Sequence, residues 1–222
     1  MILNGGMVKY KTSPQLSPLT GKLIIPGDKS VSHRALLLAA IAEGDTYIKN
    51  LCDGADVAST RHALEQLGII IRDIAPHQIQ VQGQGLLGLK KAPVALDLGN
   101  SGTTMRLLPG ILVNQSFAST LIGDISLLKR PMQRVIDPLR AVGAQINSMN
   151  NGCAPLHIEP ITQALQPIDY VLPLASAQVK SCLLLAGLYT AGRSKITEKI
   201  STRDHTERLF KQFNIPLYHS QT

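Results

Sequence analysis

The sequence predicts an α/β protein built from three similar units, each with the element order βαβαββ. Two observations point to this class. At three places a turn rich in Gly, Ser and Ala opens an apolar helix-like run, and each run is followed by a β-like stretch and then a second helix-like stretch. Hydrophobic residues make up 44% and charged residues 17% of the 222 residues, which is typical of a folded core and excludes a disordered chain.

The first unit is expected over Gly21–Ala92. The extended stretch LIIPG (Leu23–Gly27) predicts its first strand, and the run GDKSVSHRALLLAAIAEG from Gly27 predicts its first helix. The stretches that follow are TYIKNL, ADVASTRHALEQLGI, IIIRD and QIQVQG, which predict a strand, a helix and two strands. Gly68 ends the second helix, because glycine adopts the positive φ that helix ends require.

The second unit is expected over Pro93–Pro167. The run GNSGTTMRLLPGIL from Gly99 predicts one helix, STLIGD a strand, and RPMQRVIDPLRAVGAQI a second helix that ends at Gly143. Apolar residues in this second helix recur at the helical period, as Val135, Leu139 and Val142.

The third unit is expected from Ile168 to Thr222, and it stops short of its last two strands. It contains ASAQVKSCLLLAGLYTAG from Ala175, then SKITEK and TRDHTERLFKQFNI, where Asn214 replaces the closing glycine and also tolerates a positive φ. The helices are expected to pack inside the strands or against a sheet. A chance similarity between three short patterns is the alternative, and the shared order of elements argues against it.

The positive charge of the chain requires an anionic partner. Lys and Arg number 22 and Asp and Glu 15, so the net charge is 22 − 15 = +7. A nucleic-acid surface and a pocket for small, multiply anionic substrates are the two candidates. Nucleic-acid binders cluster their Lys and Arg residues and place aromatic residues among them. Here aromatic residues are only 4%, Trp is absent and the cations are scattered singly. We therefore expect a small-anion pocket and no nucleic-acid partner.

Membrane, disulfide and metal chemistry are not expected. The longest apolar run, Ala35–Ala42, has eight residues, whereas a spanning helix needs about 20. The first ten residues are not expected to be a signal peptide, because they contain two glycines and a lysine where such a peptide has an apolar core. Cys52, Cys153 and Cys182 match neither a disulfide framework nor a metal knuckle, and no two histidines are three or four residues apart. We expect buried thiols in the reducing cytoplasm, no membrane partner and no metal site.

The start of each unit's first helix is suited to an anion. A helix N-terminus offers unpaired N–H groups and the positive end of the helix dipole, Ser and Thr add hydroxyl donors, and Gly allows close approach. In the first unit, Lys29, Ser30 and Arg34 lie within one and a half turns and can converge on one ligand. The alternative is a capped helix with two solvated cations.

The other units repeat this arrangement. The second offers Asn100-Ser101-Gly102-Thr103-Thr104 followed by Arg106, without the glycine and lysine pattern of a P-loop. The third offers Ser176-Ala177-Gln178 and Lys180. Arg130, before a Pro131 expected at the first helical position, and Arg203 are further cations where a loop leads into a helix.

Five motifs, GDKSVSHRALLLAAIAEG, LGNSGTTMRLLPGIL, GDISLLKRPM, ASAQVKSCLLLAGL and STRDHTERLF, occur in this order and spacing. With them the chain, from Lys22 to about Leu217, resembles the N-terminal half of the 5-enolpyruvylshikimate-3-phosphate synthase family, in its bacterial SAQVK and RDHTE variant. The resemblance implies the enolpyruvyl transferase fold, with two domains of three βαβαββ units each. It assigns residues 1–18 to the other domain and residues 19–222 to a three-unit domain whose third unit is incomplete.

The resemblance also implies an activity. The family transfers the enolpyruvyl group of phosphoenolpyruvate to the 5-hydroxyl of shikimate 3-phosphate and releases phosphate, without a cofactor, on the route to chorismate and the aromatic amino acids. By motif, Lys29 would be catalytic and contact both substrates. The residues implied for shikimate 3-phosphate are Lys29, Ser30, Arg34, Ser176, Ala177, Gln178 and Arg203, and those for phosphoenolpyruvate are Lys29, Gly102, Arg130 and Gln178.

The chain departs from the family in length. The family's acid–base aspartate and glutamate lie in the other domain, so we expect this chain to be a substrate-binding half that is inactive alone. A separate C-terminal half is a candidate partner that would complete it. Three alternatives remain: a truncated, non-catalytic remnant, an enolpyruvyl transferase acting on UDP-N-acetylglucosamine, and a basic RNA-handling protein with a related repeat fold. The UDP-N-acetylglucosamine enzymes use a reactive loop cysteine that none of the three cysteines here matches.

Overall fold

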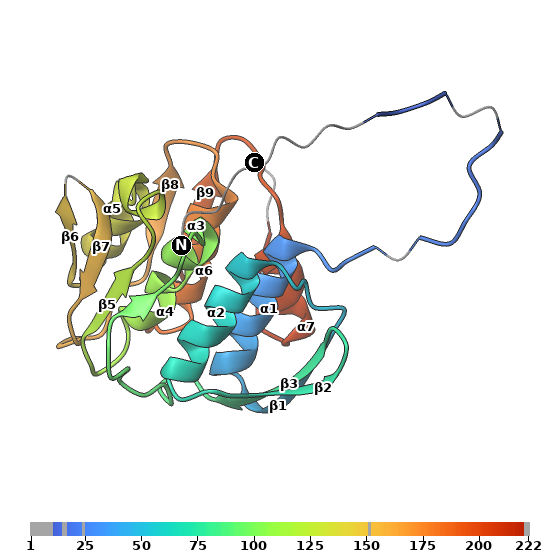
Figure 1. The fold of residues 1–222 in the computed structure, drawn as a ribbon. Helices are drawn as coiled ribbons and strands as arrows, with labels where there is room; N and C mark the ends of the chain where they lie inside the picture. The colour runs from blue at the N-terminus through green and yellow to red at the C-terminus, as the bar shows by residue number, and fades with distance from the viewer. Residues whose placement is uncertain (1–10, 15–16, 24, 151, 220–222) are drawn as a thin grey trace.

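The computed structural model describes residues 11–14, 17–23, 25–150 and 152–219. Three sheets lie around the outside, and most of the helices lie between them (Figure 1). Residues 11–14 and 17–23 are exposed and belong to no helix or strand.

The first unit contains helix α1 (Lys29–Ile41), strand β1 (Glu43–Lys49), helix α2 (Ala55–Gln66) and strands β2 (Ile70–Ala75) and β3 (Gln78–Gln84). The three strands form an antiparallel sheet in the order β1-β3-β2. As predicted, α2 ends before a residue with a positive φ, because Gly68 has a φ of +88°.

The second unit contains eight elements and one four-stranded sheet, in the order β4-β5-β7-β6. Its first two strands pair in parallel, and its last strands form an antiparallel hairpin. The elements are β4 (Leu96–Asp97), α3 (Gly102–Leu107), α4 (Pro109–Leu112), β5 (Ser119–Ile122), the 3₁₀ turn η1 (Leu127–Lys129), α5 (Gln133–Ala141), β6 (Ile146–Asn150) and β7 (Cys153–Ile158).

The third unit contains β8 (Asp169–Leu172), α6 (Ala177–Gly187), β9 (Lys195–Glu198) and α7 (His205–Gln212). Strands β8 and β9 pair in parallel, as β4 and β5 do. In the part of the chain that the structure describes, no strand follows α7. From the first helix onward, the elements of the first two units follow the predicted order, and the described part of the third unit contains a strand, a helix, a strand and a helix in that order.

The hydrophobic core lies where the first helices of the three units meet. Every residue of α1 from Ser32 to Ile41 is buried, which is possible only for a helix surrounded by other elements. Helix α6 packs against α3, α4 and α5, and α1 packs against α2, α3 and α7. Of the two arrangements expected, the structure has the first, with the helices inside the strands.

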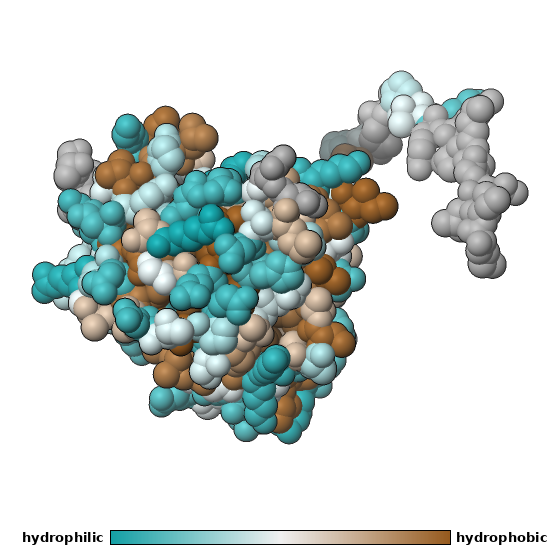
Figure 2. All heavy atoms as spheres, turned by 90° about the vertical axis from the view of Figure 1, so that its left-hand side faces the viewer, coloured by the Kyte–Doolittle hydropathy of each residue, from teal (hydrophilic) through white to brown (hydrophobic). Residues whose placement is uncertain are grey.

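The outer faces of the sheets carry polar side chains. Side chains of β3 and β7 alternate between buried and half-buried, as expected for strands with one face on the core. Figure 2 shows the molecule from the side of β6 and β7, where hydrophilic side chains cover much of the surface and hydrophobic ones gather in small patches.

Three expectations about local structure are wrong. No strand forms in the described part of Leu23–Gly27, because a strand needs a neighbouring strand, and Gly27 instead packs so closely on the Asn50 carbonyl that a Cβ would lie 1.8 Å from its oxygen. The run from Gly99 forms two helices, since Pro109 has no N–H to continue the first.

The third error concerns Pro131. It is not the first residue of a helix, because it bridges to Cys153 and the N–H of Met132 bonds to the Gly152 carbonyl at 2.7 Å, so α5 begins only at Gln133. The cysteines are free thiols as expected, but only Cys182 is buried and the other two are half-buried.

Candidate functional site

The predicted residues of the first unit lie at the start of α1. Asp28 caps the helix, since its carboxylate accepts the N–H of Val31 at 2.7 Å. Lys29 follows as an exposed cation whose ammonium forms an ion pair with Asp56 in the first turn of α2. The side chain of Lys29 is 54% exposed, so it remains accessible to a ligand.

Arg34 connects three helix starts. This residue is 3% exposed, and its guanidinium donates hydrogen bonds to Thr206 of α7 at 2.8 Å and to Ser181 of α6 at 2.7 Å. It also donates to the Ser30 hydroxyl at 2.7 Å and, at 3.5 Å, to the Ala177 carbonyl. All three guanidinium nitrogens therefore bond to the protein itself. Because Ser30 accepts from Arg34, its own O–H is oriented away from Arg34 and is available to a ligand or to His205.

The third unit contributes the start of α6. Ser176 caps this helix by accepting the N–H of Val179 at 3.4 Å, and it is half-buried together with Ala177 and Gln178. Lys180, one turn further along, is 5% exposed and forms ion pairs with glutamates. The structure thus brings the predicted residues of α1 and α6 to adjoining helix starts.

The second unit meets the third at Gln178. Its side-chain carbonyl accepts from Arg106 at 3.0 Å and its amide donates to Thr103 at 3.1 Å, which joins the start of α6 to α3. Gly102 lies beneath two arginines, since a Cβ built on it would lie 3.0 Å from Nη1 of Arg130 and 3.1 Å from Nη1 of Arg106. The four residues predicted for phosphoenolpyruvate thus lie in two places. Lys29 is at the start of α1, whereas Gly102, Arg130 and Gln178 lie together where α3 meets α6.

The positive charge is concentrated at these helix starts. Burial, followed by the charge of the nearby Arg203, lowers the pKa of Arg34 to about 10. Burial, Arg134 and Arg130 likewise lower the pKa of Arg106. These arginines repel one another, and a multiply charged anion bound among them would relieve the repulsion.

A chain of buried polar side chains joins α1, α2 and α3. His33 is fully buried, and its Nδ1 lies 2.6 Å from the hydroxyl of Thr60, which lies 2.5 Å from that of Thr104. Ser101, the cap of α3, continues the chain at 2.6 Å. Burial, followed by the charge of Lys29, lowers the pKa of His33 to about 4, so the imidazole is neutral at pH 7.

Sequence reasoning missed several of these partners. It noted Arg106 and Lys180 near helix starts but gave them no role, and it did not identify Ser181 or Thr206. Ser181 follows Ala177 by four residues, so it lies one turn further on the same helix face, and this spacing was a usable signal.

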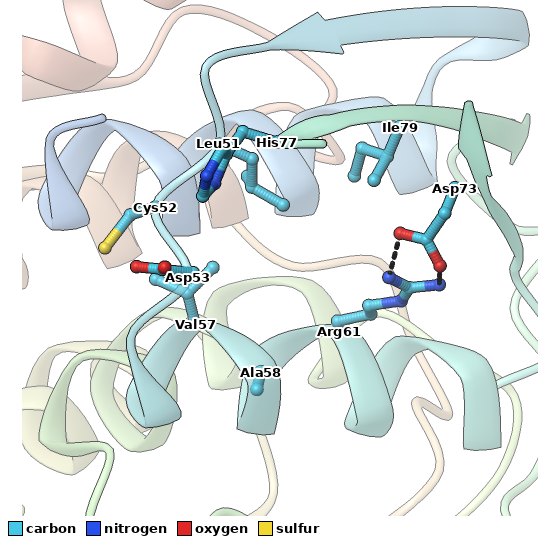
Figure 3. Close-up of a pocket in the computed structure, with 9 residues that line it drawn as sticks. All are labelled: Leu51, Cys52, Asp53, Val57, Ala58, Arg61, Asp73, His77 and Ile79. Carbon is cyan, nitrogen blue, oxygen red and sulfur yellow. Dashed lines mark hydrogen bonds and ion pairs between the residues drawn. The ribbon is translucent and has the colours of Figure 1, made fainter. Parts of the chain in front are cut away.

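Two cavities lie away from the predicted residues. One, of about 180 Å³, lies between α2 and the β1–β3 sheet, where Arg61 and Asp73 close one end with an ion pair (Figure 3). The other, of about 470 Å³, is lined from all three units by Leu86, Leu87, Asn114, the loop 161–164 and residues 188–191. The candidate site is therefore the group of helix starts and not a preformed cavity of this structure.

Comparison with known proteins identifies the family. The family model for EPSP synthase (3-phosphoshikimate 1-carboxyvinyltransferase) matches residues 14–222. The chain belongs to this family. The resemblance predicted from the five motifs is confirmed.

Curated relatives agree. A 3-phosphoshikimate 1-carboxyvinyltransferase of Alkalilimnicola ehrlichii is 55% identical over 201 residues, which cover 90% of this chain and 44% of that protein. One from Acidithiobacillus ferrooxidans is 50% identical over 211 residues, covering 95% of this chain and 48% of that protein. The chain thus spans a little under half the length of the curated relatives it matches.

A solved structure gives the same result for the fold. The EPSP synthase from Acinetobacter baumannii superposes with a TM-score of 0.83 and 47% identity, over 86% of this chain and 43% of that one. The predicted enolpyruvyl transferase fold is therefore confirmed. Within the described residues, no helix is long and apolar enough to cross a membrane.

Proposed function

We propose that this protein transfers the enolpyruvyl group of phosphoenolpyruvate to the 5-hydroxyl of shikimate 3-phosphate and releases phosphate, on the route to chorismate and the aromatic amino acids. Membership of the EPSP synthase family supports this reaction. Because the chain spans under half of its relatives, we assign to it the half that binds shikimate 3-phosphate. A second half, on the same polypeptide or on a separate one, completes the site.

The observation that carries this proposal is the junction of three helix starts around Arg34, with the unpaired cation Arg203 beside it. Among the described residues, Arg203 has no hydrogen-bond or ion-pair partner, yet it is close enough to lower the pKa of Arg34. A phosphate at the start of α6 meets unpaired N–H groups, a helix dipole and this cation. The residues proposed to bind shikimate 3-phosphate are Lys29, Ser30, Arg34, Ser176, Ala177, Gln178 and Arg203.

Phosphoenolpyruvate is assigned to the neighbouring group around Gly102. Arg130 offers a guanidinium there, and the missing Cβ of Gly102 leaves room between it and Arg106. Gln178 lies between the two substrates, because it belongs to α6 and bonds to α3. Lys29 completes the assignment as the catalytic cation that contacts both, which requires it to leave Asp56 when the substrates bind.

The remaining chemistry belongs to the second half. Proton transfer needs a titratable group within hydrogen-bond reach of the reacting atoms, and the family places its acid–base carboxylates in the other domain. We assign residues 1–18, of which 1–10 and 15–16 lie outside the described residues, to that domain, and residues 19–222 to the three-unit domain. The three free cysteines support a reducing, cytoplasmic location.

Calorimetric titration with shikimate 3-phosphate tests the proposal. Arg203→Ala is the decisive variant, because this exposed side chain has no role in the fold. A charged hydrogen bond contributes about 1.5–3 kcal/mol, so the affinity is expected to fall about tenfold or more. Arg72→Ala is the control, since Arg72 is an exposed arginine of β2 and is not one of the residues assigned to the ligand. Equal affinities for all three proteins would exclude this binding site, and binding without turnover in a completed enzyme would identify the chain as a non-catalytic remnant.

A further inference from the structure

A buried charge cluster joins the third unit's elements behind the candidate site. Lys180 of α6 lies 2.7 Å from Oε2 of Glu198 in β9 and 2.6 Å from Oε1 of Glu207 in α7. The side chains of the three residues are 7%, 16% and 19% exposed. Thr202 donates to the other oxygen of Glu198, whereas Oε2 of Glu207 is buried with no hydrogen-bond partner among the described residues.

Lys180 differs from the other cations of the site. Arg203 and Lys29 are exposed, but Lys180 is covered and both of its partners are carboxylates. It is therefore not placed to contact a substrate.

Lys180 and Glu207 each neighbour a residue that bonds to Arg34. Ser181, next to Lys180 in sequence, and Thr206, next to Glu207, both accept hydrogen bonds from Arg34. Glu207 is near enough to raise the pKa of Arg34, against the larger effect of burial. Two buried cations, Arg34 and Lys180, thus balance two carboxylates, and Arg203 keeps its charge for a ligand.

We propose that Lys180 is a positioning residue, which neutralises Glu207 and Glu198 and so holds the start of α7 where Arg34, Arg203 and the start of α6 act on one oxyanion. This proposal rests on the function proposed above and extends it to a residue that does not contact substrate. Without Lys180, the carboxylate of Glu207 has no ion-pair partner among the described residues, and Arg34 is a nearby cation. The negative charge of Glu207 would then offset the positive charge at the oxyanion site. Its attraction to Arg34 would also pull α7 toward α1.

The experiment measures affinity separately from stability. Wild type, Lys180→Met and Lys180→Met/Glu207→Gln are titrated with shikimate 3-phosphate and, in a second series, with inorganic phosphate, well below the melting temperature of each protein. Leu209→Ala is the matched control, because Leu209 is a buried residue of the same helix α7 that carries no charge and is not part of the cluster. Lys211→Met removes an exposed lysine from the far end of that helix.

We expect Lys180→Met to bind both ligands at least tenfold more weakly, and the added Glu207→Gln to recover most of the loss. Leu209→Ala should lower the melting temperature and leave both affinities unchanged. A Lys180→Met affinity equal to that of the controls, or a loss that Glu207→Gln does not recover, overturns the proposal. If Lys180→Met does not fold, the triple variant Lys180→Met/Glu198→Gln/Glu207→Gln is titrated with phosphate instead. An affinity near that of the wild type supports charge neutralisation by Lys180, and a tenfold loss overturns the proposal.

The two ligands separate this inference from the proposed function. If the wild type binds inorganic phosphate but not shikimate 3-phosphate, the proposed substrate is wrong. The titrations with inorganic phosphate then still test the role of Lys180. Wild type that binds neither ligand overturns both proposals.

Discussion

Arg34 of α1 donates a 2.7 Å hydrogen bond to Ser181 of α6, a residue 147 positions further along the chain. Ser181 in turn donates to the Ala177 carbonyl at 2.6 Å and accepts from Thr206 at 2.7 Å. One hydroxyl thus fixes the mutual position of the first and third units at the point where the candidate site is formed. The arginine is satisfied by the protein, so its charge is held in place before any ligand arrives.

We expect Ser181→Ala to destabilise the fold. The substitution leaves Arg34 with a buried, unpaired donor, which costs about 1–3 kcal/mol, and more when the group is charged. Urea denaturation measures the change in the free energy of unfolding. Ser59→Ala is the control, since Ser59 also bonds to the carbonyl four residues earlier, at 3.1 Å, but has no arginine partner. Equal losses in the two variants would show that Ser181 does not hold the units together.

Gly102→Ala is expected to weaken phosphoenolpyruvate binding without loss of stability. A Cβ would lie 3.0 Å from Arg130 and 3.1 Å from Arg106, so both guanidiniums must shift by a few tenths of an ångström. The backbone itself is helical there, and alanine favours a helix over glycine by about 1 kcal/mol. The melting temperature should therefore hold or rise.

The binding measurement for Gly102→Ala uses the enzyme completed with a second half. The inhibition constant of the phosphonate glyphosate, used as a probe of the same position, should rise together with KM for phosphoenolpyruvate. Gly187→Ala in α6 is the control, because a Cβ there makes only ordinary contacts at 3.4 Å. An unchanged inhibition constant for Gly102→Ala would refute the assigned role of this position.

The free energy of unfolding should fall as the pH is lowered from 6.5 to about 4, the range set by the two pKa values of His33. Burial lowers the pKa of this imidazole from 6.5 to about 4 in the folded protein. The unfolded chain therefore binds a proton between these values that the folded chain does not, and stability rises with pH over this window. The difference of 2.5 pKa units (6.5 − 4) corresponds to a loss on the order of 3 kcal/mol between pH 6.5 and 4.

Urea denaturation at several pH values checks this expectation. His33→Asn should flatten the slope in that window, whereas His62→Asn, at an exposed position of α2, should leave it unchanged. An equal slope for wild type and His33→Asn would mean that other groups determine the acid sensitivity.

Local signals in the sequence predicted much of the fold. Gly68 and Asn214 could be identified as helix ends, and they have positive φ of +88° and +54°, because a helix end depends only on nearby residues. The break before Pro109 was also a local signal, and it was not used. The missing strand in Leu23–Gly27 could not be predicted this way, because a strand depends on a partner that local sequence does not specify.

The site was predictable in its residue types but not in its connections. Cations, hydroxyls and glycine at three helix starts indicated an anion site. The bonds from Arg34 to Ser181 and Thr206 join residues 147 and 172 positions apart, and only the packing of α1 against α6 and α7 creates them. The charge cluster around Lys180 has the same origin, since its members come from a helix, a strand and a second helix.

The last prediction concerns catalysis by the 222-residue chain alone, which we expect to bind shikimate 3-phosphate and to show no measurable synthase turnover. In the function proposed above, the chain provides one wall of the site, and closure of a cleft, exclusion of water and delivery of acid–base groups need the other wall. Among the described residues, the β8–β9 sheet has two strands where the sheet of the second unit has four. Phosphate release is measured with the purified chain, free of host enzyme, and again after a second half is supplied from a family member. Turnover is expected only in the second case, and release at an ordinary enzymatic rate by the chain alone would show that its own residues carry the acid–base chemistry.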